Sequence, residues 1–161
     1  METALAGVLP LRVTQCGTEK CASGHQFGPF VRDCYLIHYI FSGCGTALVT
    51  PFLMDGSVDW DSLDRLVEAQ LAGGVSCLVA AGTTGEPATM TREERLAVIR
   101  RVVQKAAGRV PVIAGTGGNN TREVIEEARL ARECGADAQL CVTPYYNKTT
   151  QAGLIAHYHA I

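Results

Sequence analysis

The sequence lacks a surplus of charge of either sign and lacks any long apolar run. Its 14 basic and 16 acidic residues leave a formal charge of −2, so no broad electrostatic field is available to recruit nucleic acid or an anionic membrane. The densest apolar stretch, at residues 35–41, is far shorter than the ~20 residues that span a bilayer. The N-terminus also lacks the cationic segment and cleavage site of a secretory signal. These absences favour a cytosolic protein whose partners are small molecules or proteins, with no nucleic-acid or membrane partner.

The sequence also lacks a convincing set of metal ligands. Cys77, Cys134 and Cys141 lie inside apolar runs, which predicts small buried thiols in a reducing compartment. A zinc site is the alternative for the remaining cysteines and two nearby histidines, namely Cys16, Cys21, Cys34, Cys44, His25 and His38. Their spacing does not give a closed tetrahedral set, so we predict no metal.

The chain divides into two regions of different character. Residues 1–42 show no sustained helical or strand period, and we interpret them as an irregular N-terminal leader without an assigned function. From residue 43 onward, short apolar runs alternate with amphipathic stretches. The apolar runs lie at about 45–50, 75–81, 110–115 and 138–142, and the amphipathic stretches at about 59–73, 91–107 and 121–134. This alternation predicts repeated βα units, with a fourth helical stretch reaching Ile161.

The amphipathic stretches carry start and stop signals of helices. Asp59 and Thr91 are expected N-caps, and Thr91 with Glu94 forms the pattern of a capping box. Thr121 is the expected start of the third helix. Each stretch is followed by glycine, at residues 73–74, 108 and 135, as expected where the chain leaves a helix in the left-handed conformation.

Apolar strands without polar alternation indicate a parallel sheet with crossover helices. Either a (β/α)₈ barrel or an open doubly wound sheet fits this α/β pattern. Four strands and three full helices amount to half of a barrel, which needs about 250 residues.

The loops after the second and third apolar runs are rich in glycine and threonine. Residues 82–86 read Gly-Thr-Thr-Gly-Glu, and residues 115–120 read Gly-Thr-Gly-Gly-Asn-Asn. Glycine lets the backbone approach a ligand, and threonine supplies hydroxyls that can hold a carboxylate. The alternatives are a tight strand-to-helix turn and a phosphate cradle. The phosphate cradle has little support, since neither loop has the spacing of a nucleotide-binding motif.

Two neighbouring phenols follow the fourth apolar run, at Tyr145 and Tyr146. A tyrosine can relay protons when it is hydrogen-bonded into a chain of hydroxyls, which Thr83 or Thr84 could extend. The alternative is that both rings pack over the mouth of the fold with their hydroxyls in water.

Four segments on successive βα units together resemble the dihydrodipicolinate synthases. They are Gly-Thr-Ala-Leu-Val-Thr-Pro-Phe at 45–52, Gly-Thr-Thr-Gly-Glu at 82–86, Ala-Gly-Thr-Gly at 114–117 and Thr-Pro-Tyr-Tyr-Asn at 143–147. The resemblance covers about residues 43–161 and favours the synthases over the related sialic-acid lyases.

The resemblance implies the N-terminal half of a (β/α)₈ barrel and a lyase of lysine and diaminopimelate biosynthesis. In that family a lysine forms a Schiff base with pyruvate, which condenses with aspartate semialdehyde to give 4-hydroxy-tetrahydrodipicolinate, without cofactor or metal. By analogy Thr84 would hold the pyruvate carboxylate with help from Thr83, and Thr83 and Tyr146 would belong to a proton relay. The tyrosine matching Tyr146 reaches a neighbouring subunit across a dimer, so a homo-oligomer, either a dimer or a tetramer, is expected.

The family's Schiff-base lysine, carboxylate-binding arginine and third relay tyrosine correspond to positions beyond Ile161. The lysines present are Lys20, Lys105 and Lys148, and none lies where a desolvated amine is expected. We therefore expect the 161-residue chain to be inactive alone. The alternative functions are another class I pyruvate aldolase, such as a sialic-acid or keto-sugar-acid lyase, and a non-catalytic half-barrel that pairs with a partner through its open edges.

Some synthases are inhibited by lysine near the dimer interface. Asn119, Glu123 and Tyr145 match three polar positions of that possible allosteric site. Where inhibited relatives carry histidines, this chain has Arg92 and Arg95, whose permanent charges would repel a lysine ammonium. We therefore predict no lysine feedback.

Overall fold

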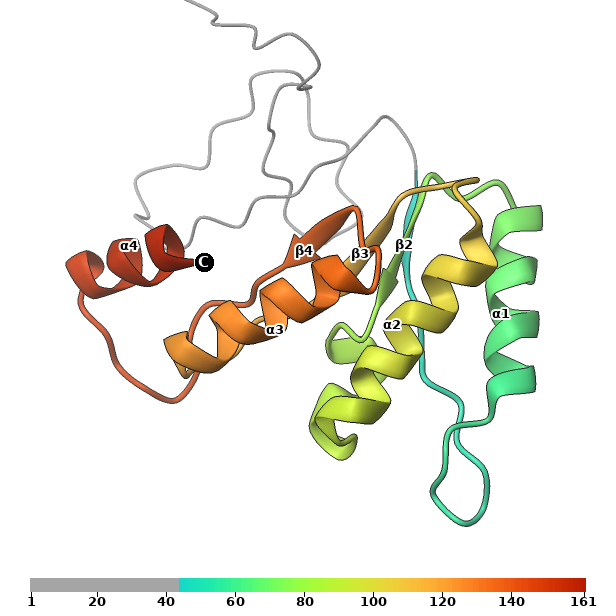
Figure 1. The fold of residues 1–161 in the computed structure, drawn as a ribbon, viewed down its shortest axis with the longest axis horizontal. Coiled ribbons are helices and arrows are strands. Elements are labelled where there is room, and N and C mark those ends of the chain that lie inside the picture. The colour runs from blue at the N-terminus through green and yellow to red at the C-terminus, as the bar shows by residue number, and fades with distance from the viewer. Residues whose placement is uncertain (1–43) are drawn as a thin grey trace, which may run out of the picture.

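The computed structural model describes residues 44–161 (Figure 1). Its elements follow one another as β1 (Gly45–Ala47), α1 (Trp60–Ala72), β2 (Cys77–Ala80), α2 (Arg92–Ala106), β3 (Val112–Gly115), α3 (Thr121–Glu133), β4 (Ala138–Leu140) and α4 (Gln151–Ala160). Two short 3₁₀ turns, η1 (Thr83–Gly85) and η2 (Pro87–Thr89), lie between β2 and α2. The repeated βα pattern expected from the sequence is confirmed. The expected leader at 1–42 lies outside the described residues.

The four strands form one parallel sheet in the order β1-β2-β3-β4. Every strand pairs with its neighbour in sequence, and α1, α2 and α3 lie side by side along one face of the sheet (Figure 1). A doubly wound sheet would reverse its strand order and place helices on both faces. The arrangement is instead that of half a (β/α)₈ barrel, as one of the two expected fold classes predicted.

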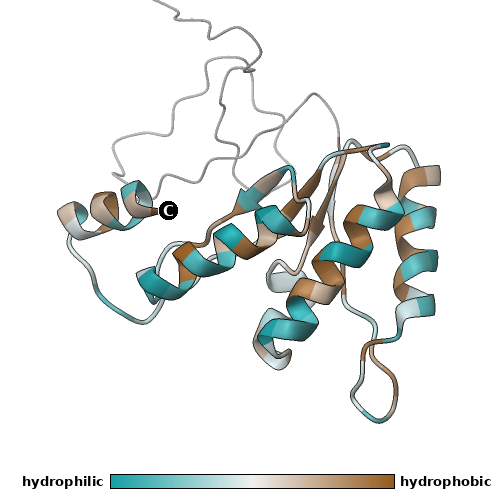
Figure 2. Ribbon diagram, viewed as in Figure 1, coloured by the Kyte–Doolittle hydropathy of each residue, from teal (hydrophilic) through white to brown (hydrophobic). Residues whose placement is uncertain are grey.

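The core lies between the sheet and the three helices. Leu78 and Ala80 of β2 are fully buried, as are Leu63 of α1 and Val102 of α2. Figure 2 shows the apolar strands behind helices whose outward faces are hydrophilic. The alternate side chains of β2 and β3, including Val79 and Ile113, are only half-buried. The sheet face opposite the helices is therefore less buried within residues 44–161, because helices cover the barrel wall from the outside alone.

The expected helix termini are found. Asp59 caps α1 through the Ser62 amide, and Thr91 and Glu94 form the predicted capping box of α2. The third helix begins at Thr121 as expected, and its N-cap is Asn120, whose side chain accepts from the Arg122 amide. Glycines at 74, 108 and 135 adopt positive φ after α1, α2 and α3.

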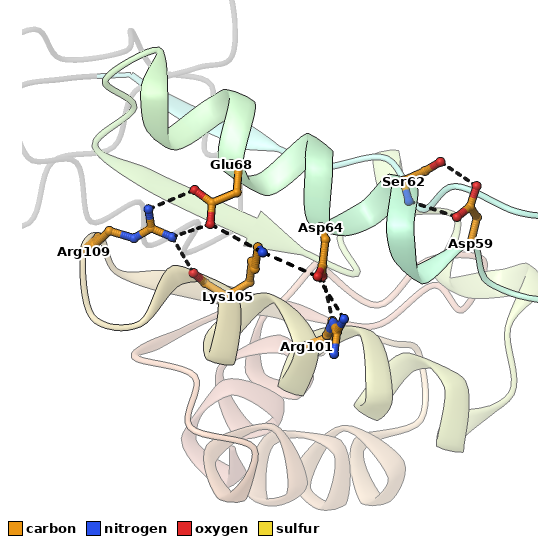
Figure 3. A network of polar contacts seen from close by, with 7 residues as sticks. All are labelled: Asp59, Ser62, Asp64, Glu68, Arg101, Lys105 and Arg109. Carbon is orange, nitrogen blue, oxygen red and sulfur yellow. Dashed lines mark hydrogen bonds and ion pairs between the residues drawn. The ribbon is translucent and has the colours of Figure 1, made fainter.

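An ion-pair network joins α1 to α2 along their exposed edges (Figure 3). Arg101 donates to both carboxylate oxygens of Asp64, at 2.7 and 2.9 Å. Arg109 makes the same two-pronged contact with Glu68, and Lys105 lies 3.5 Å from Asp64 and 3.6 Å from Glu68. The hydrogen bond from Arg101 lowers the pKa of Asp64 below its ordinary value of 3.8.

This lowered pKa predicts an acid-dependent loss of stability. Asp64 is charged in the folded chain at pH values where it is already protonated in the unfolded chain, so its contribution is complete above pH 3.8 and is lost as the pH falls through the lowered value. Asp64→Asn should remove this part of the pH dependence of the unfolding free energy, measured by urea denaturation between neutral and acidic pH. Gln104→Ala, at an exposed and uncharged position of α2, is the control and should leave the slope as in the wild type. Equal slopes for all three proteins would contradict the prediction.

Candidate functional site

Four loops leave the carboxyl ends of the parallel strands, where functional residues gather in barrels. The loop after β2 carries Thr83 and Thr84 in the 3₁₀ turn η1. Within the turn the Gly85 amide donates to the Gly82 carbonyl at 2.8 Å, and the Glu86 amide donates to the Thr83 carbonyl at 3.2 Å. Both threonines are exposed, and neither hydroxyl has a hydrogen-bond partner within residues 44–161. The turn therefore presents two adjacent hydroxyls that are available to a ligand.

The backbone on both sides of this turn is strained. Ala81 has φ of +52° and Glu86 has φ of +54°, a left-handed conformation that is unfavourable for residues with a Cβ. Such strain persists only where the surrounding structure holds it, and it concentrates at functional sites. The fold thus holds the Thr83–Gly85 turn against a local conformational cost.

Close backbone packing from β3 helps to hold the strained segment. A Cβ on Gly115 would lie 2.2 Å from the Ala81 carbonyl oxygen and 2.8 Å from the Gly82 Cα. Glycine at 115 is therefore required so that the loop after β2 can rest on the end of β3.

The loops after β3 and β4 are joined by hydrogen bonds. Asn119 Nδ2 donates to the Tyr145 carbonyl at 3.2 Å, and Asn147 Nδ2 donates to the Asn119 carbonyl at 3.0 Å. A Cβ on Gly117 would lie 2.1 Å from the Val142 amide nitrogen, so glycine also permits this contact. These contacts fix the loop that carries Tyr145 and Tyr146 to the loop that precedes α3.

The two tyrosines differ in exposure. Tyr145 is 55% exposed, whereas Tyr146 is 100% exposed and has φ of +68°. No hydrogen bond joins Tyr146 to Thr83 in the part of the chain described. The proton relay between these residues is not assembled within the single chain, and it stays a prediction.

A small cleft of about 100 Å³ brings together the three residues expected at an allosteric site. Asn119, Glu123 and Tyr145 line it together with Arg92 and Arg95. Glu123 is also held at the N-terminus of α3, where its carboxylate accepts from Nδ2 of the N-cap residue Asn120 at 2.9 Å.

Glu127 of α3 forms ion pairs with both arginines of this cleft. Its Oε1 accepts from Arg92 Nε at 2.6 Å and from Arg95 at 3.2 Å, and only 12% of the Glu127 side chain is exposed. This carboxylate raises the pKa of Arg92. The arginines are therefore paired, and the repulsion that they would exert on an ammonium group is smaller than two free guanidiniums would give. The absence of lysine feedback stays a prediction.

Neither described lysine has the surroundings of a Schiff-base amine. Lys105 lies in the last turn of α2, and its Nζ is 3.5 Å from Asp64 and 3.6 Å from Glu68. Lys148 is exposed, and Lys20 lies outside the described residues. A Schiff-base lysine needs a desolvated, uncharged amine, which an ion-paired or exposed lysine does not provide.

The cysteines agree only in part with expectation. Cys134 is buried, whereas Cys77 and Cys141 are half-buried. Residues 44–161 contain no group of three or more His, Cys, Asp or Glu side chains that could hold a metal ion. Of the residues considered for a zinc site, only Cys44 is described, and it is exposed.

No helix within residues 44–161 is long and apolar enough to cross a bilayer.

Comparison with known proteins identifies the family. The profile of the dihydrodipicolinate synthetase family matches residues 40–161. The chain belongs to this family. Among curated relatives, the 4-hydroxy-tetrahydrodipicolinate synthase of Maridesulfovibrio salexigens is 56% identical over 121 residues, which are 75% of this chain and 41% of that protein. The synthase of Acidithiobacillus ferrooxidans is 57% identical over 122 residues, or 76% of this chain and 42% of that protein.

Solved structures of the dihydrodipicolinate synthetase family share the fold. The synthase of Acinetobacter baumannii, described as chloride-inhibited and complexed with pyruvate, is 53% identical with a TM-score of 0.72 over 73% of this chain and 40% of that one. The synthase of Aquifex aeolicus is 48% identical with a TM-score of 0.70 over the same shares. The chain thus spans about two fifths of the length of the synthases that it matches, and the half-barrel is the part shared with them.

Several site features emerged only from the structure. They are the buried hydroxyl of Thr50, the close packing at Gly115 and the pairing of Glu127 with Arg92 and Arg95. Thr50 was visible in the sequence as a polar residue directly after an apolar run, the position at which barrel strands carry functional groups. Glu127 gave no such signal, because acids are ordinary in a surface helix such as α3.

Proposed function

We propose that this chain supplies the pyruvate-binding half of a 4-hydroxy-tetrahydrodipicolinate synthase, which condenses pyruvate with aspartate semialdehyde. The observation that carries the proposal is the strained turn with the exposed hydroxyls of Thr83 and Thr84, which have no hydrogen-bond partner within residues 44–161. Over 121 residues the chain is 56% identical to a synthase of that name. The synthase of Acinetobacter baumannii, 53% identical, is described in complex with pyruvate.

In this proposal Thr84 donates its hydroxyl to the pyruvate carboxylate, and Thr83 helps to hold it. Thr83 also passes protons with Tyr146. The threonine turn lies at the carboxyl end of β2, where both hydroxyls are open to a ligand. A carboxylate suits them because charge-assisted hydrogen bonds are stronger than neutral ones.

The full exposure of Tyr146 supports a homo-oligomer. The Tyr146 side chain is 100% exposed and its backbone is strained. Hydrogen bonds of Asn119 and Asn147 fix the loop of Tyr146 to the loop after β3. Tyr146 is therefore placed to reach a second subunit. A dimer or tetramer would bring it into a neighbouring site. We also propose a cytosolic location, which the free thiols of Cys44, Cys77, Cys134 and Cys141 support.

Borohydride trapping tests the proposal with two proteins. The first is the 161-residue chain, and the second, the joined enzyme, continues residues 44–161 with the remaining C-terminal part of the Maridesulfovibrio salexigens synthase. After incubation with pyruvate and borohydride, mass spectrometry should find a stable adduct on one lysine of the joined enzyme and none on the chain alone, because Lys105 and Lys148 are ion-paired or exposed.

Either of two results would contradict the proposal. An adduct on a lysine of the 161-residue chain would show that the nucleophile lies within it. A folded joined enzyme that forms no adduct would show that the threonine turn does not serve pyruvate. The unmodified relative, treated in parallel, is the positive control.

A further inference from the structure

The hydroxyl of Thr50, at the end of the β1 segment, is buried and reaches the loop after β2. Thr50 is 4% exposed, and its Oγ1 donates to the Gly85 carbonyl at 2.7 Å across 35 residues of sequence. The Leu48 amide donates to the Val79 carbonyl at 2.9 Å, so β1 continues beside β2 up to this point. Thr50 therefore connects the first βα unit to the last residue of the Thr83–Gly85 turn.

The turn also packs tightly against this segment. Gly85 is buried, and a Cβ there would lie 3.1 Å from the Leu48 carbonyl oxygen and 3.3 Å from Thr50 Oγ1. A larger residue at 85 would push the turn away from Thr50. The contact therefore depends on glycine on one side and on a short hydroxyl side chain on the other.

The turn needs an external constraint. It spans three residues, contains the two local hydrogen bonds described above, and lies between two left-handed residues, Ala81 and Glu86. A short turn with strained ends is not held by its own hydrogen bonds, because strain persists only when surrounding structure over-determines it. The Thr50 hydroxyl provides such a constraint from the segment that follows β1.

We propose that Thr50 is a positioning residue, which sets the orientation of Thr83 and Thr84 through its hydrogen bond to Gly85. The identity of the ligand rests on the proposed function, whereas the mechanical role of Thr50 does not. Thr50 itself is buried and acts on the ligand only through the turn.

Amide hydrogen exchange of the 161-residue chain tests the mechanical role. Thr50→Val keeps the shape of the side chain and removes the hydroxyl, whereas Thr50→Ser keeps the hydroxyl. In Thr50→Val the Gly85 and Glu86 amides should exchange about tenfold faster, while amides of α2 stay within about twofold of wild type. Thr50→Ser should restore slow exchange at the turn. The proposal is overturned if Thr50→Val leaves the turn unchanged, if the chain gives no protection at the wild-type turn, or if both variants behave alike.

Kinetics of the joined enzyme test the consequence for ligand binding. Thr50→Val should raise the KM for pyruvate about tenfold, since misplacement of a carboxylate-binding turn weakens binding. It should also lower kcat, because Thr83 of the same turn belongs to the proposed proton relay. Thr50→Ser should lie within about threefold of wild type for both constants. A fall in kcat alone, or a loss of activity explained by a lower Tm, would overturn the positioning role. If the wild-type joined enzyme forms no pyruvate adduct while exchange at the turn still responds to Thr50→Val, the proposed function fails and the positioning role stands.

Discussion

Replacing Gly115 with alanine is expected to destabilise the fold by about 3 kcal/mol, at the upper end of the usual cost of overpacking. The added Cβ would lie 2.2 Å from the Ala81 carbonyl oxygen, 2.7 Å from the Ala81 carbonyl carbon and 2.8 Å from the Gly82 Cα. These are backbone atoms of a segment already strained at Ala81, so no flexible side chain can move aside. The loop after β2 must shift or β3 must bend.

Urea denaturation of the joined enzyme, followed by circular dichroism, measures this loss. Gly118→Ala is the matched control, because its Cβ would meet only a side-chain methyl of Val124, at 3.2 Å. We expect the control to change stability by less than about 1 kcal/mol, since alanine also restricts the unfolded chain. Equal denaturation midpoints for the two variants would show that the end of β3 does not support the turn.

Replacing Thr84 with valine is expected to lower kcat/KM for pyruvate in the joined enzyme by about 100-fold. A hydrogen bond to a charged group contributes about 1.5–3 kcal/mol, and each 1.4 kcal/mol is a factor of ten. Thr84 is exposed and its hydroxyl has no partner in the described chain, so the valine variant should keep the wild-type Tm.

Thr84→Ser separates the hydroxyl from the rest of the side chain. It should retain activity within about tenfold of wild type, because the donor is kept and only a methyl group is lost. Steady-state kinetics with varied pyruvate measure both variants. If Thr84→Val matched wild type, Thr84 would not hold the carboxylate, and the assignment of the turn would fail.

The elements of the fold were predictable because their signals are local. The capping box at Thr91 and Glu94 was expected and found, and glycine follows each of α1, α2 and α3 with positive φ. The start of α3 at Thr121 was predicted, whereas its N-cap was not, because Asn120 and Thr121 are both good N-caps and only the structure shows which side chain accepts the Arg122 amide. The alternation of apolar and amphipathic stretches did not distinguish a barrel from an open sheet. The family resemblance implied the barrel, and the strand order confirms it.

The loops that form the candidate site were predictable from the sequence, whereas the contacts that hold those loops in place were not. Thr83, Thr84 and the tyrosine pair stood out as unusual residues after strands. The support from Thr50 and Gly115 depends on contacts across about 35 residues of sequence, which no periodicity reports. The pairing of Glu127 with two arginines was not predictable, because Arg92 and Arg95 lie on α2 and the contact arises from the packing of two helices.

The strand order β1-β2-β3-β4 has a consequence for how the chain acquires its structure. Within residues 44–161 each strand pairs with the strand of the preceding βα unit, so each of these pairings closes a loop of one unit. A loop of one unit costs less entropy to close than a longer loop, and domains form from the N-terminal side during synthesis. The threonine turn should therefore be assembled on the ribosome as soon as β3 emerges, because both of its supports, Thr50 and Gly115, have been made by then.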